Sequence, residues 1–277
     1  STPPWASLRT LEEAARLFEQ DENALEEKWI KQLIGPGSSL GGARPKSTVE
    51  DVDGSLWIAK FPSKHDEVDS GAWEMVAHDL AKICGLDVPD AKLEKFSKLG
   101  STFIVKRFDR EGDRRIHFAS AMTMLGETDG ASAAENISYL DIASFIRSNG
   151  AAPNKDLKEL WKRIVFNIAI SNTDDHLRNH GFILTDKGWC LSPLYDVNPV
   201  PYGDNLSLNI SSEDSTISVD LALETAQYYN IEENEAKQAA EQILTSVREH
   251  WKEFAEKYGI SRSNIEYMKW AFSASDS

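Results

Sequence analysis

The feature that most constrains this 277-residue chain is one long apolar helix that gives way abruptly to a polar loop. In "NKDLKELWKRIVFNIAISN" the apolar residues recur every three or four positions from Leu157 to Ile168, and Asp156 with Glu159 is placed like an acidic capping box. A stripe this regular predicts a helix buried in a core. The loop "SNTDDHLRNHGF" follows at once, so we expect its side chains to be displayed on a rigid support, as catalytic groups commonly are.

The residues before position 109 combine helices with strands. Residues 8–34 carry helix formers at helical spacing, and "GPGSSLGGARPK" then breaks the pattern with glycines. "SLWIAKFP" predicts a strand, and "GAWEMVAHDLAKICGL" predicts an amphipathic helix ended by Gly85. "AKLEKFSKLGSTFIVKRF" predicts a β-hairpin that turns near Leu99 and Gly100.

From residue 109 onward the patterns are mostly helical. Two short strands around the turn "TDKG" are predicted within "GFILTDKGWCLSPLYD", and residues 220–273 predict two or three amphipathic helices. We therefore expect an α+β protein with two lobes. Residues 1–108 would form a small lobe with a mixed β-sheet and one main helix, and residues 109–277 a helical lobe that carries the polar loop.

Composition excludes several classes of protein. A formal net charge of −15 leaves no overall basic footprint, so direct nucleic-acid binding is not expected. The two cysteines form no CxxC pair, which argues against a disulfide framework or a structural zinc site. No apolar run approaches the roughly 18 to 20 residues that a membrane span needs. These properties favour a cytoplasmic protein that does not bind membranes.

The polar loop contains a spacing that is typical of phosphotransfer. Asp174 and Asn179 lie five positions apart. This is the D-x-x-x-x-N spacing of a kinase catalytic loop, in which the Asp receives the substrate's hydroxyl proton and the Asn binds magnesium. Asp175 is a second candidate for the base, but only Asp174 gives the five-residue step.

A third acid follows the two predicted strands. Asp196 lies 17 residues beyond Asn179, and a two-strand excursion of that length can return it beside the loop as a second magnesium ligand. The usual Asp-Phe-Gly motif is absent, because Val197 and Asn198 follow. Each acid taken alone reads better as a turn residue or a helix cap. Their order around one helix and one hairpin favours the catalytic interpretation.

The same reaction needs groups that hold the nucleotide. Lys60 in the strand "LWIAKFP" is placed like the phosphate-binding lysine of kinases. Glu74, 14 residues later, either orients that lysine or is a solvated helix residue. The backbone N–H groups of the glycine-rich segment, around Gly41 and Gly42, are suited to covering phosphates. The backbone of residues 106–108 (Lys106, Arg107 and Phe108) ends the hairpin where a kinase hinge would bind adenine.

As a set, these motifs resemble the HipA family of bacterial serine/threonine kinases, the toxins of toxin–antitoxin pairs. The resemblance covers about residues 35–205 and rests on "SSLGGARPK", "WIAKFP", "VPDAKL", "VKRFDR", "SNTDDHLRNHGF" and "LSPLYDVNP". It implies a two-lobed protein-kinase-like fold that transfers a phosphoryl group from ATP, with Mg²⁺, to a protein serine or threonine.

The resemblance also implies a role for each matching residue. Lys60 would hold the phosphates and Asp174 would be the catalytic base. Asn179 and Asp196 would bind magnesium, and His176 would lie near the nucleotide.

Regulation and partners follow from the same resemblance. Ser39, or its neighbour Ser38, would be autophosphorylated in the glycine-rich loop, which expels the loop and silences the enzyme. Family substrates include aminoacyl-tRNA synthetases, and the usual partner is a HipB-like DNA-binding antitoxin. Longer members carry an extra N-terminal subdomain, which the about 34 residues before the loop cannot hold.

Two other functions fit the same fold. One is a nucleotide- and antitoxin-binding module without phosphotransfer, which has no need to keep the full set of one lysine, two aspartates and one asparagine. The other is a small-molecule phosphotransferase. The serines of the glycine-rich loop and the "VKRFDR" hinge favour a protein kinase over this alternative.

Overall fold

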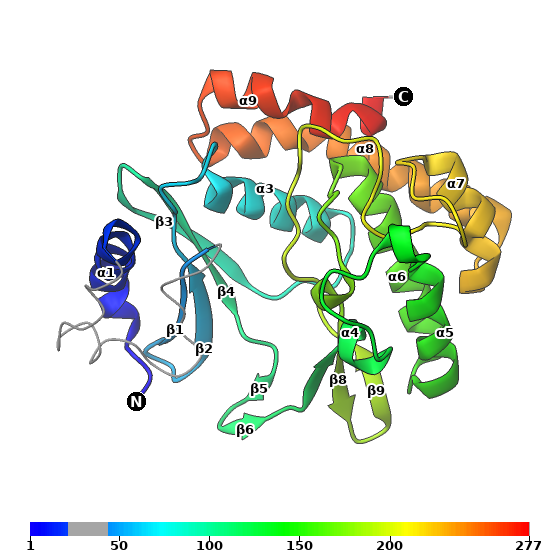
Figure 1. Cartoon of the computed structure of the whole chain (residues 1–277), viewed down its shortest axis with the longest axis horizontal. Helices are drawn as coiled ribbons and strands as arrows, with labels where there is room; N and C mark the ends of the chain where they lie inside the picture. The colour runs from blue at the N-terminus through cyan, green and yellow to red at the C-terminus, as the bar shows by residue number, and fades with distance from the viewer. Residues whose placement is uncertain (22–43, 277) are drawn as a thin grey trace. The chain divides into compact units, whose positions relative to one another are not determined.

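The computed structural model describes residues 1–21 and 44–276 (Figure 1). Two compact units are present: Ser1–Met75 with Pro89–Arg115 (unit 1), and Val76–Val88 with Ile116–Ser277 (unit 2). The functional division into lobes after residue 108 stays a prediction. The helical pattern predicted over residues 8–34 forms a helix that ends at Gln20. Residues 22–34 lie outside the described residues, as do the loop residues Ser38, Ser39, Gly41 and Gly42.

Unit 1 is built on a four-stranded sheet in the order β1-β2-β4-β3. Its strands are β1 (Lys46–Glu50), β2 (Leu56–Lys60), β3 (Ala91–Ser97) and β4 (Gly100–Lys106). The predicted strand and hairpin are confirmed, and the neighbouring strands are all antiparallel rather than of mixed direction. Strand β1 was missed by sequence reasoning because "KSTVE" holds a single large apolar residue. A two-stranded ribbon, β5 (Arg110–Glu111) and β6 (Arg114–Arg115), follows.

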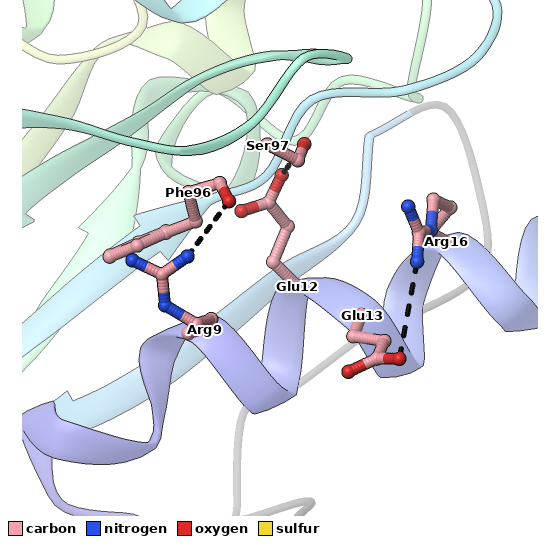
Figure 2. A pocket seen from close by; sticks show the side chains of 6 residues that line it. All are labelled: Arg9, Glu12, Glu13, Arg16, Phe96 and Ser97. Carbon is pink, nitrogen blue, oxygen red and sulfur yellow. Dashed lines mark hydrogen bonds and ion pairs between the residues drawn. The ribbon is translucent and has the colours of Figure 1, made fainter.

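Helix α1 (Leu8–Gln20) forms the core of unit 1 together with the sheet. Its buried residues Leu8, Leu11, Ala14 and Ala15 recur at helical spacing and pack with apolar residues of β2 and β4. Hydrogen bonding completes the contact at the end of β3, where the Ser97 hydroxyl donates to Glu12 Oε1 at 2.7 Å (Figure 2).

The polar edge of α1 and the end of β3 line a pocket of about 230 Å³ (Figure 2). Arg9 donates to the Phe96 carbonyl at 3.0 Å and lies over the Phe96 ring. Burial raises the pKa of the Glu12 carboxyl, against the lowering effects of the Ser97 hydrogen bond and of Arg16 and Arg9. These contacts fix α1 on the edge strand of the sheet.

Helix α3 (Ser70–Ile83) matches the predicted amphipathic helix, and Gly85 ends it in the left-handed conformation with φ of 79°. Its first turn passes very close to β4. A Cβ atom at Gly71 would lie 2.4 Å from the backbone oxygen of Ser101, so only glycine fits there. This close approach sets the position of the helix residues that follow within unit 1.

We expect Gly71→Ala to lower the free energy of unfolding of the protein by about 3 kcal/mol, because the added methyl group meets backbone that cannot yield cheaply. Gly85→Ala is the matched control. Its Cβ would meet nothing within 4 Å, so only the left-handed backbone resists it, at about 1 kcal/mol. Urea denaturation measures both. Equal stability of Gly71→Ala and the wild type would show that α3 does not press on β4.

Unit 2 is mostly helical and surrounds α6 (Pro153–Ile170), which is buried along most of its length from Leu157 onward. Its other main helices are α5 (Tyr139–Asn149), α7 (Val219–Thr225), α8 (Glu233–Lys257) and α9 (Arg262–Met268). Each of the first three contacts α6. Shorter helical segments are α4 (Ala121–Met124), η3 (Ala133–Glu135), η4 (Leu177–Asn179), η5 (Ala226–Tyr229) and η6 (Lys269–Asp276). The predicted core helix and the C-terminal helices are confirmed.

The start of α6 differs from the prediction. Its N-cap is Ala152 without a side-chain cap, and Pro153 occupies the first turn. The predicted acidic capping box is therefore wrong. Asp156 instead accepts the Leu191 N–H at 2.9 Å, which fixes a strand against the helix.

A small sheet in the order β7-β8-β9 completes unit 2. Strands β8 (Gly181–Thr185) and β9 (Gly188–Leu191) form the predicted hairpin, and β7 (Phe118–Ser120) adds a third strand along β8. No helix within the described ranges is long and apolar enough to cross a membrane.

Candidate active site

The polar loop is bound back onto the helix that precedes it. Helix α6 ends at Ile170, and its C-cap Ser171 has a left-handed backbone with φ of 53°. The next residue, Asn172, donates its N–H to the Asn167 carbonyl at 2.8 Å and its side-chain amide to Asn167 Oδ1 at 3.0 Å. The loop therefore starts from a fixed point at the end of a buried helix.

Asp175 is the internal anchor of the loop. Its carboxylate is buried, and one of its oxygens, Oδ2, lies 2.6 Å from the Tyr139 hydroxyl, 3.1 Å from Asn167 Nδ2 and 2.6 Å from His180 Nε2. Burial and the Asp175 charge raise the pKa of Tyr139, so the hydroxyl stays protonated and donates. A carboxylate held by three donors inside the core is a structural group.

Asp174 has the opposite environment. Its side chain is 76% exposed, and its Oδ1 lies 3.1 Å from Nε2 of His176. Of the two adjacent acids, only Asp174 is accessible from solvent. Its role as the base stays a prediction, and so does the contact of His176 with a nucleotide.

Asn179 closes the same loop at the end of η4. Its side-chain Oδ1 accepts the backbone N–H of His176 at 2.9 Å, which fixes the direction of the amide. An amide oxygen carries a second lone pair, so this hydrogen bond leaves Asn179 capable of ligating a cation.

The segment that carries Asp196 is held against this loop by hydrogen bonds on both sides. Before Asp196, the Tyr195 hydroxyl donates to the Arg178 carbonyl at 2.8 Å. After it, the Val200 N–H donates to the Ser171 carbonyl at 3.2 Å. The structure therefore brings the Asp196 segment beside the loop of Asp174 and Asn179. Magnesium binding by Asn179 and Asp196 stays a prediction.

Two further hydrogen bonds stabilise this arrangement. The Ser192 N–H donates to the Gly181 carbonyl at 2.8 Å, and buried Arg163 donates to the Ser192 carbonyl at 2.8 Å. Burial, reinforced by the charge of Asp196, raises the pKa of Tyr195 and keeps its hydroxyl protonated. Asp196 itself adopts a left-handed backbone with φ of 56°, which costs about 1 kcal/mol and is typical of functional sites.

Unit 1 contains the predicted lysine and glutamate. Lys60 Nζ lies 2.7 Å from Glu74 Oε2, and both side chains are largely buried. The alternative of a solvated Glu74 is therefore wrong. An ion pair in this position orients the ammonium group, while phosphate binding by Lys60 stays a prediction.

Two backbone N–H groups of the predicted hinge are already used in hydrogen bonds within unit 1. The Lys106 N–H donates to the Asp90 carbonyl at 2.8 Å, and the Arg107 N–H donates to the Leu56 carbonyl at 2.9 Å. Neither N–H is left for adenine, so these two residues could contribute carbonyl oxygens only. Phe108 stays a predicted nucleotide-binding residue.

Sequence reasoning missed the residues that hold the loop in place. Tyr139, Asn167 and His180 bind Asp175, and Tyr195 holds the segment of Asp196. The motif residues were visible from their spacing, whereas these four act through contacts that no spacing rule describes. The available signal was polar residues at positions that the helical pattern places in the core, such as Asn167 on α6.

Comparison with solved structures defines the class of fold. The chain matches one from a Shewanella oneidensis MR-1 complex of the toxin–antitoxin proteins HipA and HipB with operator DNA, with a TM-score of 0.70 and 18% identity, covering 93% of this chain and 68% of that one. It also matches the Helicobacter pylori proinflammatory kinase CtkA, with a TM-score of 0.52 and 13% identity over 83% and 94% of the two chains. The fold is protein-kinase-like, as predicted.

The family model for the HipA-like C-terminal domain matches residues 38–251, and the chain belongs to this family. A Sinorhizobium fredii protein named "Putative kinase Y4mE" is 29% identical over 230 residues, which cover 69% of this chain and 53% of the relative. The chain thus spans about half the length of that curated relative.

Proposed function

We propose that this protein is an ATP-dependent serine/threonine kinase of the HipA type, with Asp174 as its general base. The observation that carries the proposal is the division between two adjacent acids. Asp175 is buried and bound by three donors, while Asp174 is exposed on the loop that Asp175 anchors. A base must reach the hydroxyl of an incoming substrate, and of these two carboxylates only the exposed one is placed to do so.

Each of the chain's own residues in this reaction has one assigned role. Asp174 accepts the proton of the substrate serine or threonine hydroxyl while the hydroxyl oxygen bonds to the γ-phosphorus of ATP. The bond between that phosphorus and the oxygen of the β-phosphate breaks, and ADP leaves. His176, 3.1 Å from Asp174, restricts the orientation of that carboxylate. Lys60, oriented by Glu74 at 2.7 Å, binds the phosphates. The glycine-rich loop around Gly41 and Gly42, which lies outside the described residues, stays the predicted cover of the phosphates.

Asn179 and Asp196 have the donor chemistry that magnesium requires. One supplies an amide oxygen fixed by the His176 N–H, and the other a carboxylate on a segment bound to the same loop. Mg²⁺ prefers oxygen ligands and commonly takes only one or two from protein beside phosphates and water. No cluster of three His, Cys, Asp or Glu side chains suited to a metal occurs in the described ranges. A magnesium site made by one asparagine and one aspartate has too few such side chains to count as a cluster of that kind. When bound, the ion would neutralise phosphate charge.

The proposal extends to partners. The substrate would be a protein serine or threonine, with aminoacyl-tRNA synthetases the first candidates because family substrates include them. A HipB-like antitoxin is the proposed regulator, supported by the related chain that was solved in complex with HipB and DNA.

Incubation with labelled ATP and Mg²⁺, followed by intact-mass spectrometry, tests the proposal. We expect the protein to gain one phosphate, located at Ser38 or Ser39, and excess EDTA to prevent it. Ser38→Ala combined with Ser39→Ala should remove self-labelling and leave transfer to a protein substrate intact.

Two outcomes would contradict the proposal. Saturable ATP binding without transfer to the chain, to proteins or to metabolites would indicate a nucleotide-binding module. Transfer to a hydroxylated metabolite alone would indicate a small-molecule phosphotransferase.

A further inference from the structure

A pocket in unit 2 lies beside the polar loop, and the function proposed above assigns no ligand to it. It has a volume of about 460 Å³, within the usual range of ligand pockets. Its walls are residues 200–204, residues 216–217 and part of η6, and Ser171 closes it at the start of the loop.

Two large aromatic side chains line this pocket while remaining exposed. Trp270 is 71% exposed and Tyr202 is 67% exposed. The helical segment that carries Trp270 is firmly packed. Phe272, two residues later, is buried and stacks on Trp251 with ring centroids 4.3 Å apart. An exposed tryptophan on a fixed helical segment contributes little to the core, and aromatic residues at a concave surface are typical of binding sites.

The charge of the pocket is negative. Among its lining residues, all of which the structure describes, Asp204 is the only charged one. A carboxylate beside two aromatic rings is the chemistry that binds a lysine or arginine side chain, through an ion pair and through contact of the cation with the ring faces. The net charge of −15 adds a long-range attraction for basic segments.

The pocket is continuous with the loop that carries Asp174. Three residues beyond the wall segment 200–204, the Ser207 hydroxyl donates to the Thr173 carbonyl at 2.6 Å and so ties this part of the chain to the residue that precedes Asp174. A Cβ atom at Gly203 would lie 3.5 Å from Thr173 Cγ2, which shows how closely the two segments approach. The wall itself is fixed, because the Ile217 N–H donates to the Asp204 carbonyl at 2.9 Å.

We propose that the pocket formed by Tyr202, Asp204 and Trp270 binds a lysine or arginine side chain that flanks the acceptor serine or threonine of the protein substrate. The inference rests on the proposed kinase function, because it places the basic residue a few positions from the hydroxyl that Asp174 would deprotonate. Its occupant is a basic, extended segment of the substrate.

Peptides that share one acceptor serine and carry arginine or glutamine at each flanking position test the inference. With the wild type, we expect an arginine at one position to lower KM at least tenfold relative to glutamine. Trp270→Ala and Asp204→Asn should each raise KM for the arginine peptide about tenfold and leave KM for ATP unchanged. Asp204→Lys should reverse the preference toward a peptide with glutamate at that position. Matched controls outside the pocket are Tyr228→Ala, which removes another half-exposed aromatic, and Glu213→Gln.

Fluorescence anisotropy of the same peptides, labelled, separates this inference from the proposed function because it requires no turnover. If the wild type transfers phosphate but binds the arginine and glutamine peptides equally, the pocket assignment is wrong and the kinase function stands. If peptide binding depends on Asp204 and Trp270 but no phosphate is transferred, the pocket stands and the function fails. A wild type that sediments as a dimer, with Trp270→Ala a monomer, would make the pocket an interface between two copies and overturn the proposal.

Discussion

Asp174→Asn is expected to lower the rate of phosphotransfer by about 10²- to 10⁴-fold, the usual contribution of a general base. The amide is nearly the same size as the carboxylate but accepts no proton at neutral pH. Because the Asp174 side chain is 76% exposed, its replacement should leave the midpoint of thermal unfolding within about 1 °C of the wild type. Steady-state ADP release measures the rate, and differential scanning fluorimetry measures the midpoint.

Asp186→Asn provides the matched control, since Asp186 is an exposed acid in the turn between β8 and β9. It should behave like the wild type in both measurements. If Asp174→Asn transferred phosphate at the wild-type rate, Asp174 would not be the general base. The proton would then need another acceptor, and Asp175, with its buried carboxylate, is poorly placed to provide it.

Asp175→Ala is expected to have its main effect on stability, lowering the free energy of unfolding by about 3–5 kcal/mol. The substitution leaves the Tyr139 hydroxyl, the Asn167 amide and the His180 ring inside the core without their shared acceptor. Each orphaned buried donor costs about 1–3 kcal/mol, although the costs of linked groups do not add fully. Urea denaturation followed by tryptophan fluorescence provides the measurement.

Asp174→Ala is the control for this second experiment, because it removes the same group one position earlier from an exposed site. It should cost less than about 0.5 kcal/mol. Equal losses of stability for the two alanine variants would show that the buried network around Asp175 does not anchor the loop.

Local patterns were sufficient to predict the elements that hold the site. The three-and-four spacing along α6 and the turn "TDKG" between β8 and β9 depend on interactions within a few residues, so the sequence displays them directly. The start of α6 was predicted wrongly because Asp156 and Glu159 imitate a cap. The actual partner of the Asp156 carboxylate is the Leu191 N–H on β9, far along the chain.

Contacts between distant residues could not be predicted in the same way. Glu74 was equally compatible with a solvated position and a lysine contact, because helical periodicity does not report what a neighbouring strand presents. Asp175 receives a hydrogen bond from Tyr139, 36 positions upstream. The basic-residue pocket likewise depends on Trp270 and Tyr202, which line it from segments far apart in the sequence.

The hydrogen bonds that hold the Asp196 segment to the loop have one property in common. This property affects how far family members can diverge in sequence. Tyr195, Val200 and Ser207 all donate to main-chain carbonyl groups of the loop. Every amino acid supplies such an oxygen, so the side chain at position 178, for example, can change without removing the acceptor. Mutational drift along the loop is therefore buffered, and the attachment can outlast most of the sequence identity between distant homologues.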